Sequence, residues 1–181
     1  MKETIKLGLI LFAITVVSGG ILAGSNELTK DKIAQIEMES SLGAITEIFN
    51  PGDTFEEIEA SKLEEIIAEM PSILEVLEVY TGDSISGYAI KTIGSGYGGD
   101  LVVATGISTE GEVVGIRLLE HSETPGFGAN AEKPDYTDQF IGKSVDEEII
   151  IEGLSGATKT DTTVRAEVNE AREAFNAYFA N

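Results

Sequence analysis

The sequence contains no cysteine and only one histidine among its 181 residues. The absence of cysteine excludes disulfides, iron–sulfur clusters and zinc sites held by thiolates, and haem attached through thioethers. The single histidine, His121, cannot form a metal site built from several histidines. These absences remove several common classes of metal and haem cofactor.

Basic residues are also scarce. The chain has 12 lysines and arginines against 32 aspartates and glutamates, which gives a formal net charge of −20. A surface with this charge repels nucleic-acid phosphates and anionic lipid headgroups, and we therefore exclude nucleic acid as a partner. The acidity otherwise favours solubility and carries no information about the fold.

Charge is nearly absent from residues 5–24, where Lys6 is the only charged side chain. About 20 helical residues span about 30 Å, which is the thickness of the bilayer hydrocarbon core. We therefore predict a single transmembrane anchor over residues 1–25, with residues 5–24 in contact with the lipid bilayer. The remaining residues, 26–181, are predicted to form one domain.

A cleaved signal peptide is the alternative to an anchor. Lys2 and Lys6 would form its basic region, and Ala23-Gly24-Ser25 would be a small-residue cleavage site. The apolar run is longer than a usual signal-peptide core, which favours an uncleaved anchor. No lipobox cysteine is present.

The orientation of the anchor rests on few charges. Lys2 and Lys6 precede the span, whereas Lys30 and Lys32 follow it, so the basic residues on the two sides nearly balance. The amino terminus adds a positive charge before the span and favours an N-terminus on the cytoplasmic side. The domain is then expected on the extracytoplasmic side of the cell (cytoplasmic) membrane.

Beyond the anchor, the spacing of apolar residues predicts helices before and after a group of strands. Helical spacing runs over residues 26–49, up to the breaker Asn50-Pro51-Gly52, and again over residues 56–70. The connector Ser108-Thr109-Glu110-Gly111 suits a hairpin. Strands are predicted at residues 73–80, 86–92, 100–107 and 112–119. The expected fold class is therefore α+β, with an antiparallel sheet flanked by helices.

The glycine-rich segment Gly94-Ser95-Gly96-Tyr97-Gly98-Gly99 matches the pattern GxGxxG. A dinucleotide-binding loop needs a helix to begin at the last glycine, because the helix N-terminus holds the pyrophosphate. Here the glycines lead into a predicted strand instead. We interpret the segment as a hairpin or bulge and the match as accidental.

A second glycine-rich loop runs from His121 to Gly128. Pro125-Gly126 suits the central positions of a type II turn, in which glycine takes a positive φ. Such a loop at the end of a strand allows a planar ligand to approach the backbone closely. The residues alone are equally compatible with a plain turn.

The third segment, Ser155-Gly156-Ala157-Thr158, precedes a predicted C-terminal helix that we expect to begin near Asp161. Unpaired N–H groups and the helix dipole make a helix N-terminus a natural phosphate site. The alternative is an ordinary turn followed by an N-cap at Asp161 or Thr162. Apolar positions of this helix recur at helical spacing, at Val164, Val168, Ala171, Phe175 and Tyr178.

These segments occur in an order that resembles one family of proteins. After the apolar span come Gly96-Tyr97-Gly98-Gly99, the predicted hairpin, Glu123-Thr124-Pro125-Gly126-Phe127-Gly128, Gln139-Phe140-Ile141-Gly142-Lys143 and Ser155-Gly156-Ala157-Thr158-Lys159-Thr160. The order resembles the FMN-binding G subunits of Rnf complexes, which are ion-translocating ferredoxin:NAD oxidoreductases. It is also similar to the related C subunits of sodium-translocating NADH:quinone oxidoreductases. One departure is Glu152, where the family often has aspartate.

The resemblance implies an electron-transfer subunit with covalent FMN and no independent active site. By position in the motif, Thr158 would carry FMN through a phosphoester bond, attached by a flavin transferase, and the other members of the complex would be partners. The implied FMN-binding residues are Thr158, Ser155, Gly156, Ala157, Thr160, Glu123, Thr124, Gly126 and Phe127. We expect Glu123, Thr124, the Gly126 backbone and Phe127 to border the isoalloxazine ring, and His121 to be structural or to bond near it.

Two other functions are compatible with the sequence. One is a stand-alone extracellular flavoprotein that carries electrons outside any ion-pumping complex. The other is a membrane-anchored binding module without redox chemistry, whose glycine-rich loops contact a peptide or glycan. The span offers no buried ionisable residue for an ion path, so the coupling ion, Na⁺ or H⁺, does not follow from the sequence.

Overall fold

The computed structural model describes residues 2–180, except for the side chains of residues 2–4, 31 and 33–39. The chain divides into two compact units, Met1–Ser41 and Leu42–Asn181. The first unit consists of most of helix α1 (Lys2–Thr46), and the second contains the last residues of α1 and all other elements.

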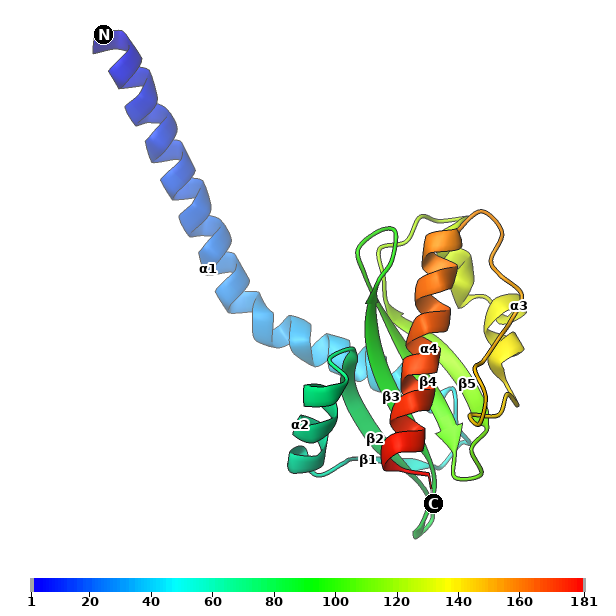
Figure 1. The fold of residues 1–181 in the computed structure, drawn as a ribbon. Coiled ribbons are helices and arrows are strands. Elements are labelled where there is room, and N and C mark those ends of the chain that lie inside the picture. Colours follow the sequence, from blue (N-terminus) through cyan, green and yellow to red (C-terminus); the bar gives the residue numbers. More distant parts are fainter. Residues whose placement is uncertain (1, 181) are drawn as a thin grey trace. The chain divides into compact units, whose positions relative to one another are not determined.

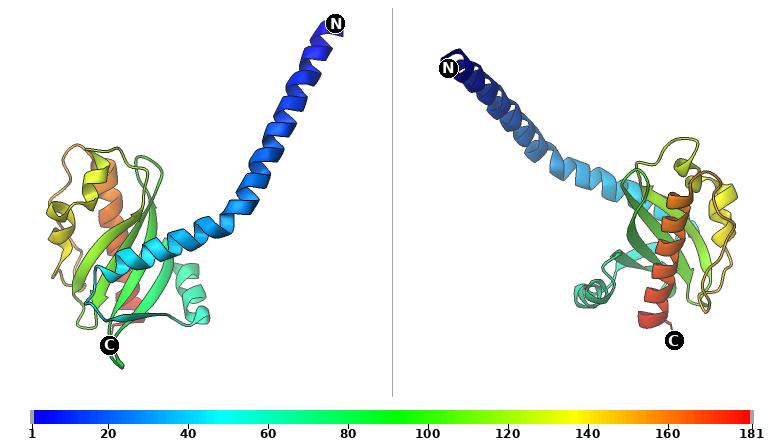
Figure 2. Two further views of the ribbon diagram at one scale, coloured as in Figure 1. Left: turned by 180° about the vertical axis from the view of Figure 1, so that it is seen from behind. Right: turned by 45° about the horizontal axis from the view of Figure 1, so that its top comes forward.

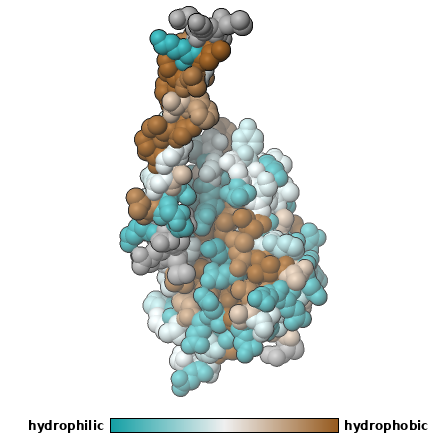
Figure 3. All heavy atoms as spheres, turned by 90° about the vertical axis from the view of Figure 1, so that its left-hand side faces the viewer, coloured by the Kyte–Doolittle hydropathy of each residue, from teal (hydrophilic) through white to brown (hydrophobic). Residues whose placement is uncertain are grey.

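The part of helix α1 that forms the first unit of the chain is largely apolar. Its stretch Ile5–Lys30 is long and apolar enough to cross a membrane. The large apolar side chains there are exposed, and they form the brown surface of the helix in Figure 3. The helix predicted over residues 26–49 continues the predicted anchor without a break and ends at Thr46.

The second unit is built on a five-stranded antiparallel sheet with strand order β1-β2-β3-β4-β5, as Figure 1 shows. Each strand pairs with its neighbour in sequence, which confirms the predicted α+β fold with an antiparallel sheet. The strands are β1 (Thr54–Glu57), β2 (Ile73–Thr81), β3 (Ser84–Ser95), β4 (Asp100–Ser108) and β5 (Val113–Glu120).

Strand β1 is absent from the sequence-based prediction, which placed a helix over residues 56–70. Helix α2 (Ala60–Glu69) begins only after this strand. β1 pairs along the edge of β2, with Phe55 opposite Val79, and the Phe55 ring packs against Phe49 at 5.8 Å. Because half of the strand is acidic and most of it is exposed, its sequence has no alternating apolar pattern to reveal it.

The two faces of the sheet are covered by different helices (Figure 2). Helix α4 (Thr158–Tyr178) packs on one face, where Val164 and Val168 join the main core. Ile45 in the last turn of α1 and Ile48 just after it pack on the other face, beside Leu77, Val79, Ala89 and Ala104. The interior strand β4 is therefore buried on both sides.

The loop between β3 and β4 is a tight hairpin, as the sequence predicted. The Gly96 N–H donates to the Gly99 carbonyl at 2.8 Å, and β4 follows directly at Asp100. No helix begins at these glycines, so the GxGxxG pattern does not form a dinucleotide-binding loop.

After β5 the chain passes through three short helices, η1 (Gly128–Glu132), α3 (Pro134–Thr137) and η2 (Asp138–Phe140). The Gly142 N–H then donates to the Val113 carbonyl at 2.8 Å, and the Val113 N–H donates to the Lys143 carbonyl at 2.9 Å. Together with the buried Phe140, these bonds fix the Gln139–Lys143 segment against β5.

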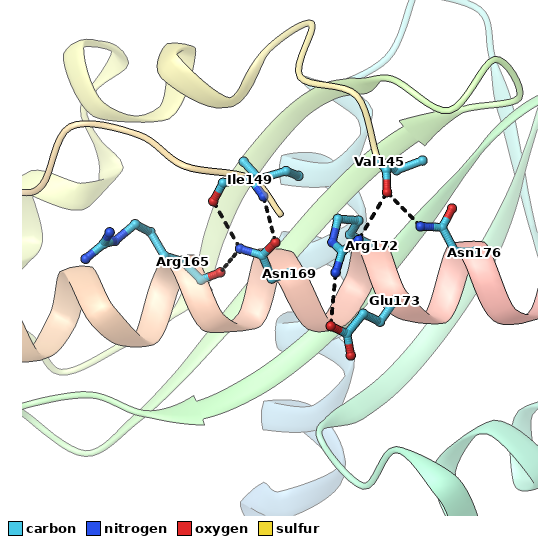
Figure 4. A network of polar contacts seen from close by, with 7 residues as sticks. All are labelled: Val145, Ile149, Arg165, Asn169, Arg172, Glu173 and Asn176. Atoms are coloured by element: carbon cyan, nitrogen blue, oxygen red, sulfur yellow. Dashed lines mark hydrogen bonds and ion pairs between the residues drawn. The ribbon is translucent and has the colours of Figure 1, made fainter. Parts of the chain in front are cut away.

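Polar side chains of α4 hold the next segment against the helix, as Figure 4 shows. Asn169 accepts from the Ile149 N–H at 2.9 Å and donates to the Ile149 carbonyl at 3.2 Å. Arg172 and Asn176 both donate to the Val145 carbonyl. These bonds fix the path by which the chain returns to the N-terminus of α4.

Candidate functional site

A cavity of about 470 Å³ lies where three segments of the domain meet. They are the β3–β4 loop, the loop after β5, and the turn that leads into α4. Most of the predicted site residues line this cavity, whereas Ser155 and Gly126 lie in the adjoining turns. The lining residues are Tyr97, Glu123, Thr124, Phe127, Gly128, Gly156, Ala157, Thr158, Lys159 and Thr160.

Two glycine turns form one side of the site. The Phe127 N–H donates to the Thr124 carbonyl at 3.1 Å, and Gly126 has φ 82°, as the predicted type II turn requires. The Ala157 N–H donates to the Leu154 carbonyl at 3.3 Å, and Gly156 has φ 79°. The Phe127 ring lies beside Gly156, so the two turns contact each other.

Helix α4 begins at Thr158, three residues earlier than the sequence predicted. Asp161 is therefore a buried residue of the first turn and not the N-cap. Its carboxylate accepts from the Tyr136 hydroxyl at 2.8 Å and from the Leu154 N–H at 3.1 Å, and it pairs with Arg165 at 2.8 Å. Burial, reinforced by the bond to Asp161, raises the pKa of Tyr136, so this hydroxyl remains a donor.

The N-terminus of α4 offers unpaired donors to the cavity. Its N-cap residue, Ala157, has no side-chain acceptor, and the first bond of the helix runs from the Asp161 N–H to the Ala157 carbonyl at 3.0 Å. The N–H groups of Thr158, Lys159 and Thr160 thus have no partner within the helix. With the positive end of the helix dipole and the exposed Lys159, they suit a phosphate group.

Glu123 is buried at the opposite side of the same helix turn, with a relative exposure of 6%. It accepts from the Thr160 hydroxyl at 2.6 Å, the Tyr97 N–H at 2.8 Å and the Gly98 N–H at 3.0 Å. Burial alone would raise the pKa of Glu123, but these hydrogen bonds outweigh that effect and hold the pKa below its ordinary value. The side chain is therefore an ionised acceptor at neutral pH.

His121 supports Glu123 from outside the cavity. Its Nδ1 lies 3.1 Å from the Glu123 N–H, from which it accepts, and its Nε2 lies 2.6 Å from Glu132 Oε1. This arrangement places a proton on Nε2. His121 does not line the cavity, so the geometry favours the structural interpretation of the two that the sequence left open.

Several glycines of the site leave room for these contacts. A Cβ at Gly96 would overlap Glu123 Oε1, and a Cβ at Gly98 would overlap the Ser122 carbonyl. A Cβ at Gly128 would overlap both Glu123 Oε2 and the Thr160 hydroxyl. The glycines of the β3–β4 loop thus matter because the loop approaches the Glu123 carboxylate closely.

The sequence did not single out Tyr97, Gly128 or Lys159 as binding residues. Tyr97 is 78% exposed and stands in the β3–β4 loop, which the sequence interpreted only as a hairpin. The signal that could have found it is the aromatic residue set between glycines, in a loop that resembles a family segment. Lys159 was visible as the neighbour of Thr158, but its place at the cavity depends on where the helix begins.

Glu152, where the sequence departs from its family, lies on the surface. Its N–H donates to Gln139 Oε1 at 2.9 Å, so the Gln139–Lys143 segment also fixes the start of the chain that leads to Thr158. The Glu152 side chain is exposed and does not line the cavity.

Family comparisons agree with this geometry. Residues 96–173 match the FMN-binding domain, and residues 1–48 match the RnfG N-terminal region. The first match contains all three segments of the cavity. Its bound group, FMN, combines a phosphate with a flat aromatic ring, and the unpaired helix N–H groups beside exposed Tyr97 and Phe127 fit that chemistry.

Individual relatives point the same way. The chain is 37% identical to the G subunit of the Na(+)-translocating ferredoxin:NAD(+) oxidoreductase complex of Acetobacterium woodii, over 93% of this chain and 89% of that protein. It is 26% identical to the G subunit of the proton-translocating complex of Clostridium ljungdahlii, over 90% of each. The crystal structure of Shewanella oneidensis NqrC shares the fold, with a TM-score of 0.50 and 20% identity over 58% of each chain. The chain therefore belongs to the RnfG family of Rnf-complex proteins, as a membrane-anchored protein with an FMN-binding domain.

Proposed function

We propose that the protein is an electron-carrying subunit of a membrane-bound ion-translocating ferredoxin:NAD oxidoreductase complex, with FMN attached covalently to Thr158. In this proposal the Thr158 hydroxyl loses its proton and its oxygen replaces one oxygen of the FMN phosphate, so that a phosphodiester forms with the net loss of one water. The names of the relatives support the complex, because each is the G subunit of a ferredoxin:NAD(+) oxidoreductase complex. The site geometry supports the attachment.

The observation that carries the proposal is the position of Thr158. It is exposed, lines the cavity and is the first residue of an uncapped 21-residue helix. A phosphate on its hydroxyl would lie beside the unpaired N–H groups of the first helix turn, in the cavity that Lys159 also lines. These groups stabilise the negative charge of a phosphodiester without any further basic residue.

The rest of the cavity suits the isoalloxazine ring. Phe127 is 57% exposed and Tyr97 is 78% exposed, so both rings offer apolar area to a flat ligand. Thr124 and the turn at Gly126 bring backbone close to the same space. When bound, FMN supplies the transfer of electrons, and the protein residues bind and orient it. No general acid or base is required of the chain.

We place the domain on the extracytoplasmic side, with residues 5–24 in the membrane as part of a residue 1–25 anchor and residues 26–181 outside. A flavin lost on that side is not replaced from the cytoplasmic FMN pool, and a covalent bond prevents the loss. A flavin transferase is the partner required for this attachment. The transferase is expected to recognise the turn residues Ser155, Gly156 and Ala157 before Thr158 and the helical residue Thr160 after it.

An intact-mass measurement tests the attachment. The full chain, co-expressed with a flavin transferase and purified in detergent, is expected to carry the mass of one FMN less one water. Thr158→Val should fold but lose this increment and the in-gel flavin fluorescence after denaturation, whereas Thr158→Ser keeps a hydroxyl and should retain part of both. Thr162→Val is the matched control, because Thr162 is exposed on α4 outside the cavity.

Flavin that remains covalently bound to Thr158→Val would contradict the assignment. Native chain without any mass increment would favour the binding module without redox chemistry. Co-purification with other membrane subunits is expected, and flavin-loaded protein that always purifies alone would instead identify a stand-alone electron carrier.

A further inference from the structure

One carboxylate connects the segments that build the cavity. Glu123 belongs to the loop after β5, accepts from Tyr97 and Gly98 in the β3–β4 loop, and accepts from Thr160 in α4. Its two oxygens divide these roles. Oε1 receives both loop N–H groups, and Oε2 receives the Thr160 hydroxyl.

The residues around Glu123 leave room for its carboxylate and hold it in place. Gly96 and Gly128 touch the carboxylate so closely that any side chain at either position would displace it. His121 Nδ1 accepts a hydrogen bond from the Glu123 N–H and thereby fixes the Glu123 backbone. Hydrogen bonds to an ionised acceptor are shorter and stronger than those between neutral groups, and the 2.6 Å bond from Thr160 is of that kind.

The contact reaches the residues that face the ligand. Tyr97 donates its own N–H to Glu123, so the carboxylate fixes the backbone that carries the exposed Tyr97 ring. Thr160 lies in the first turn of α4, two residues after Thr158, so the same carboxylate fixes the N-terminus that faces the cavity. The Thr163 hydroxyl also donates to the Ser95 carbonyl at 2.8 Å and so links α4 to the end of β3, but this bond does not reach Tyr97 or Gly98.

We propose that Glu123 is the positioning residue of the flavin site, because its ionised carboxylate joins the β3–β4 loop to the first turn of α4. It thereby keeps Tyr97 and the Thr158 hydroxyl at the lining of the same cavity. This inference rests on the proposed function for the identity of the ligand. It adds that the side-chain hydroxyl of Thr160, the last residue of the motif, serves this connection, whereas its backbone N–H stays available to the phosphate. The Glu123 charge also opposes the addition of electrons to a flavin bound beside it.

The connection is tested first without flavin. The full-length Thr158→Val chain is purified in detergent, and amide hydrogen exchange is compared with and without a second change, Thr160→Val. Because the loop and the helix turn share one carboxylate, losing the Thr160 hydroxyl should speed exchange at Tyr97 and Gly98 by about tenfold, although neither is mutated. Thr160→Ser should restore slow exchange, and Thr162→Val is the control on the exposed face.

Unchanged exchange at Tyr97 and Gly98 in Thr160→Val would overturn the connection. Glu123→Gln keeps the size of the side chain but loses its charge, and it is expected to speed exchange in the loop and in the first turn of α4 together. Faster exchange in only one of these segments would show that the contacts are independent.

The charge is tested on the flavin-loaded protein by redox titration. Glu123→Gln should shift the midpoint potential to a more positive value, because a negative charge beside the flavin is lost. Thr160→Val loosens the same contact but keeps the charge, so its shift should be smaller. Equal shifts in the two variants, or none in Glu123→Gln, would overturn the role of the charge. If no flavin is ever attached, the proposed function fails, but the exchange experiment still decides the positioning role.

Discussion

Glu167 is a second buried carboxylate of α4, but its surroundings differ from those of Glu123. Its relative exposure is 6%, its Oε2 has no hydrogen-bond partner in the described part of the chain, and it lies against Gly94 of β3. Burial raises its pKa to about 7, an effect that Thr92 reduces and the negative charge of Glu170 reinforces. The folded protein therefore holds a proton on Glu167 that the unfolded chain releases at lower pH.

This difference predicts how stability depends on pH. Between the ordinary carboxyl pKa and about 7 the folded state binds the additional proton on Glu167, so the contribution of this group to stability falls as pH rises through this window and is lost above it. The loss is at most about 3 kcal/mol. Glu167→Gln has no proton to release, so urea unfolding between about pH 5 and 8 should show a flatter profile for it. Parallel profiles for the variant and the native chain would refute this account.

At the scale of elements, α4 positions the site at one end and holds the preceding segment along its length. Asn169 makes two bonds to the backbone of Ile149, and Arg172 and Asn176 share the Val145 carbonyl (Figure 4). The segment from Val145 to the turn at Gly156 has no helix or strand of its own. Its conformation therefore depends on side chains of α4 that are distant in sequence.

Asn169→Ala removes both bonds to Ile149 and leaves a partly buried N–H and carbonyl unpaired. We expect the free energy of unfolding to fall by about 1–3 kcal/mol, measured by urea denaturation. Glu173→Ala is the matched control on the same helix, because its bond to Arg172 is at the surface and should change stability by no more than about 0.5 kcal/mol. An equal effect of the two changes would mean that Asn169 does not hold the segment.

Some elements could be predicted from the sequence and others could not. The hairpin glycines and the turn at Gly126 followed from local chemistry, because positive φ and tight turns select particular residues. Strand β1 and the first residue of α4 could not be predicted from local sequence chemistry. An acidic edge strand is formed by its pairing with β2, and Asp161 resembles an N-cap in sequence although it bonds to the distant Tyr136.

At the scale of the molecule, the apolar span and the cavity segments were visible in the sequence because each has its own composition or motif. The Glu123 contacts were not, since Tyr97 and Thr160 lie 26 and 37 residues away from it in sequence. Only the folded sheet brings these three residues together. The end of α1 was likewise predicted as a helix, but nothing in its pattern showed that it packs on the sheet.

That packing predicts where the chain can be shortened. Removal of residues 1–41 takes away the whole first unit and should leave a soluble, folded domain. Removal of residues 1–49 also takes away Ile45 and Ile48, which are 2% and 9% exposed, and uncovers Leu77 and Val79. We expect a further loss of about 3–6 kcal/mol, judged from burial of two isoleucines, and aggregation on sizing columns. Equal melting temperatures for the two fragments would contradict this role.

Because Ile45 and Ile48 belong to the core of the domain, the helix that enters the membrane ends inside the folded unit and not in a separate linker. The anchor therefore keeps the domain attached to the membrane. Any partner in the same membrane complex then meets it at an effective concentration that reaches the millimolar range for short tethers. A weak docking surface is sufficient under these conditions.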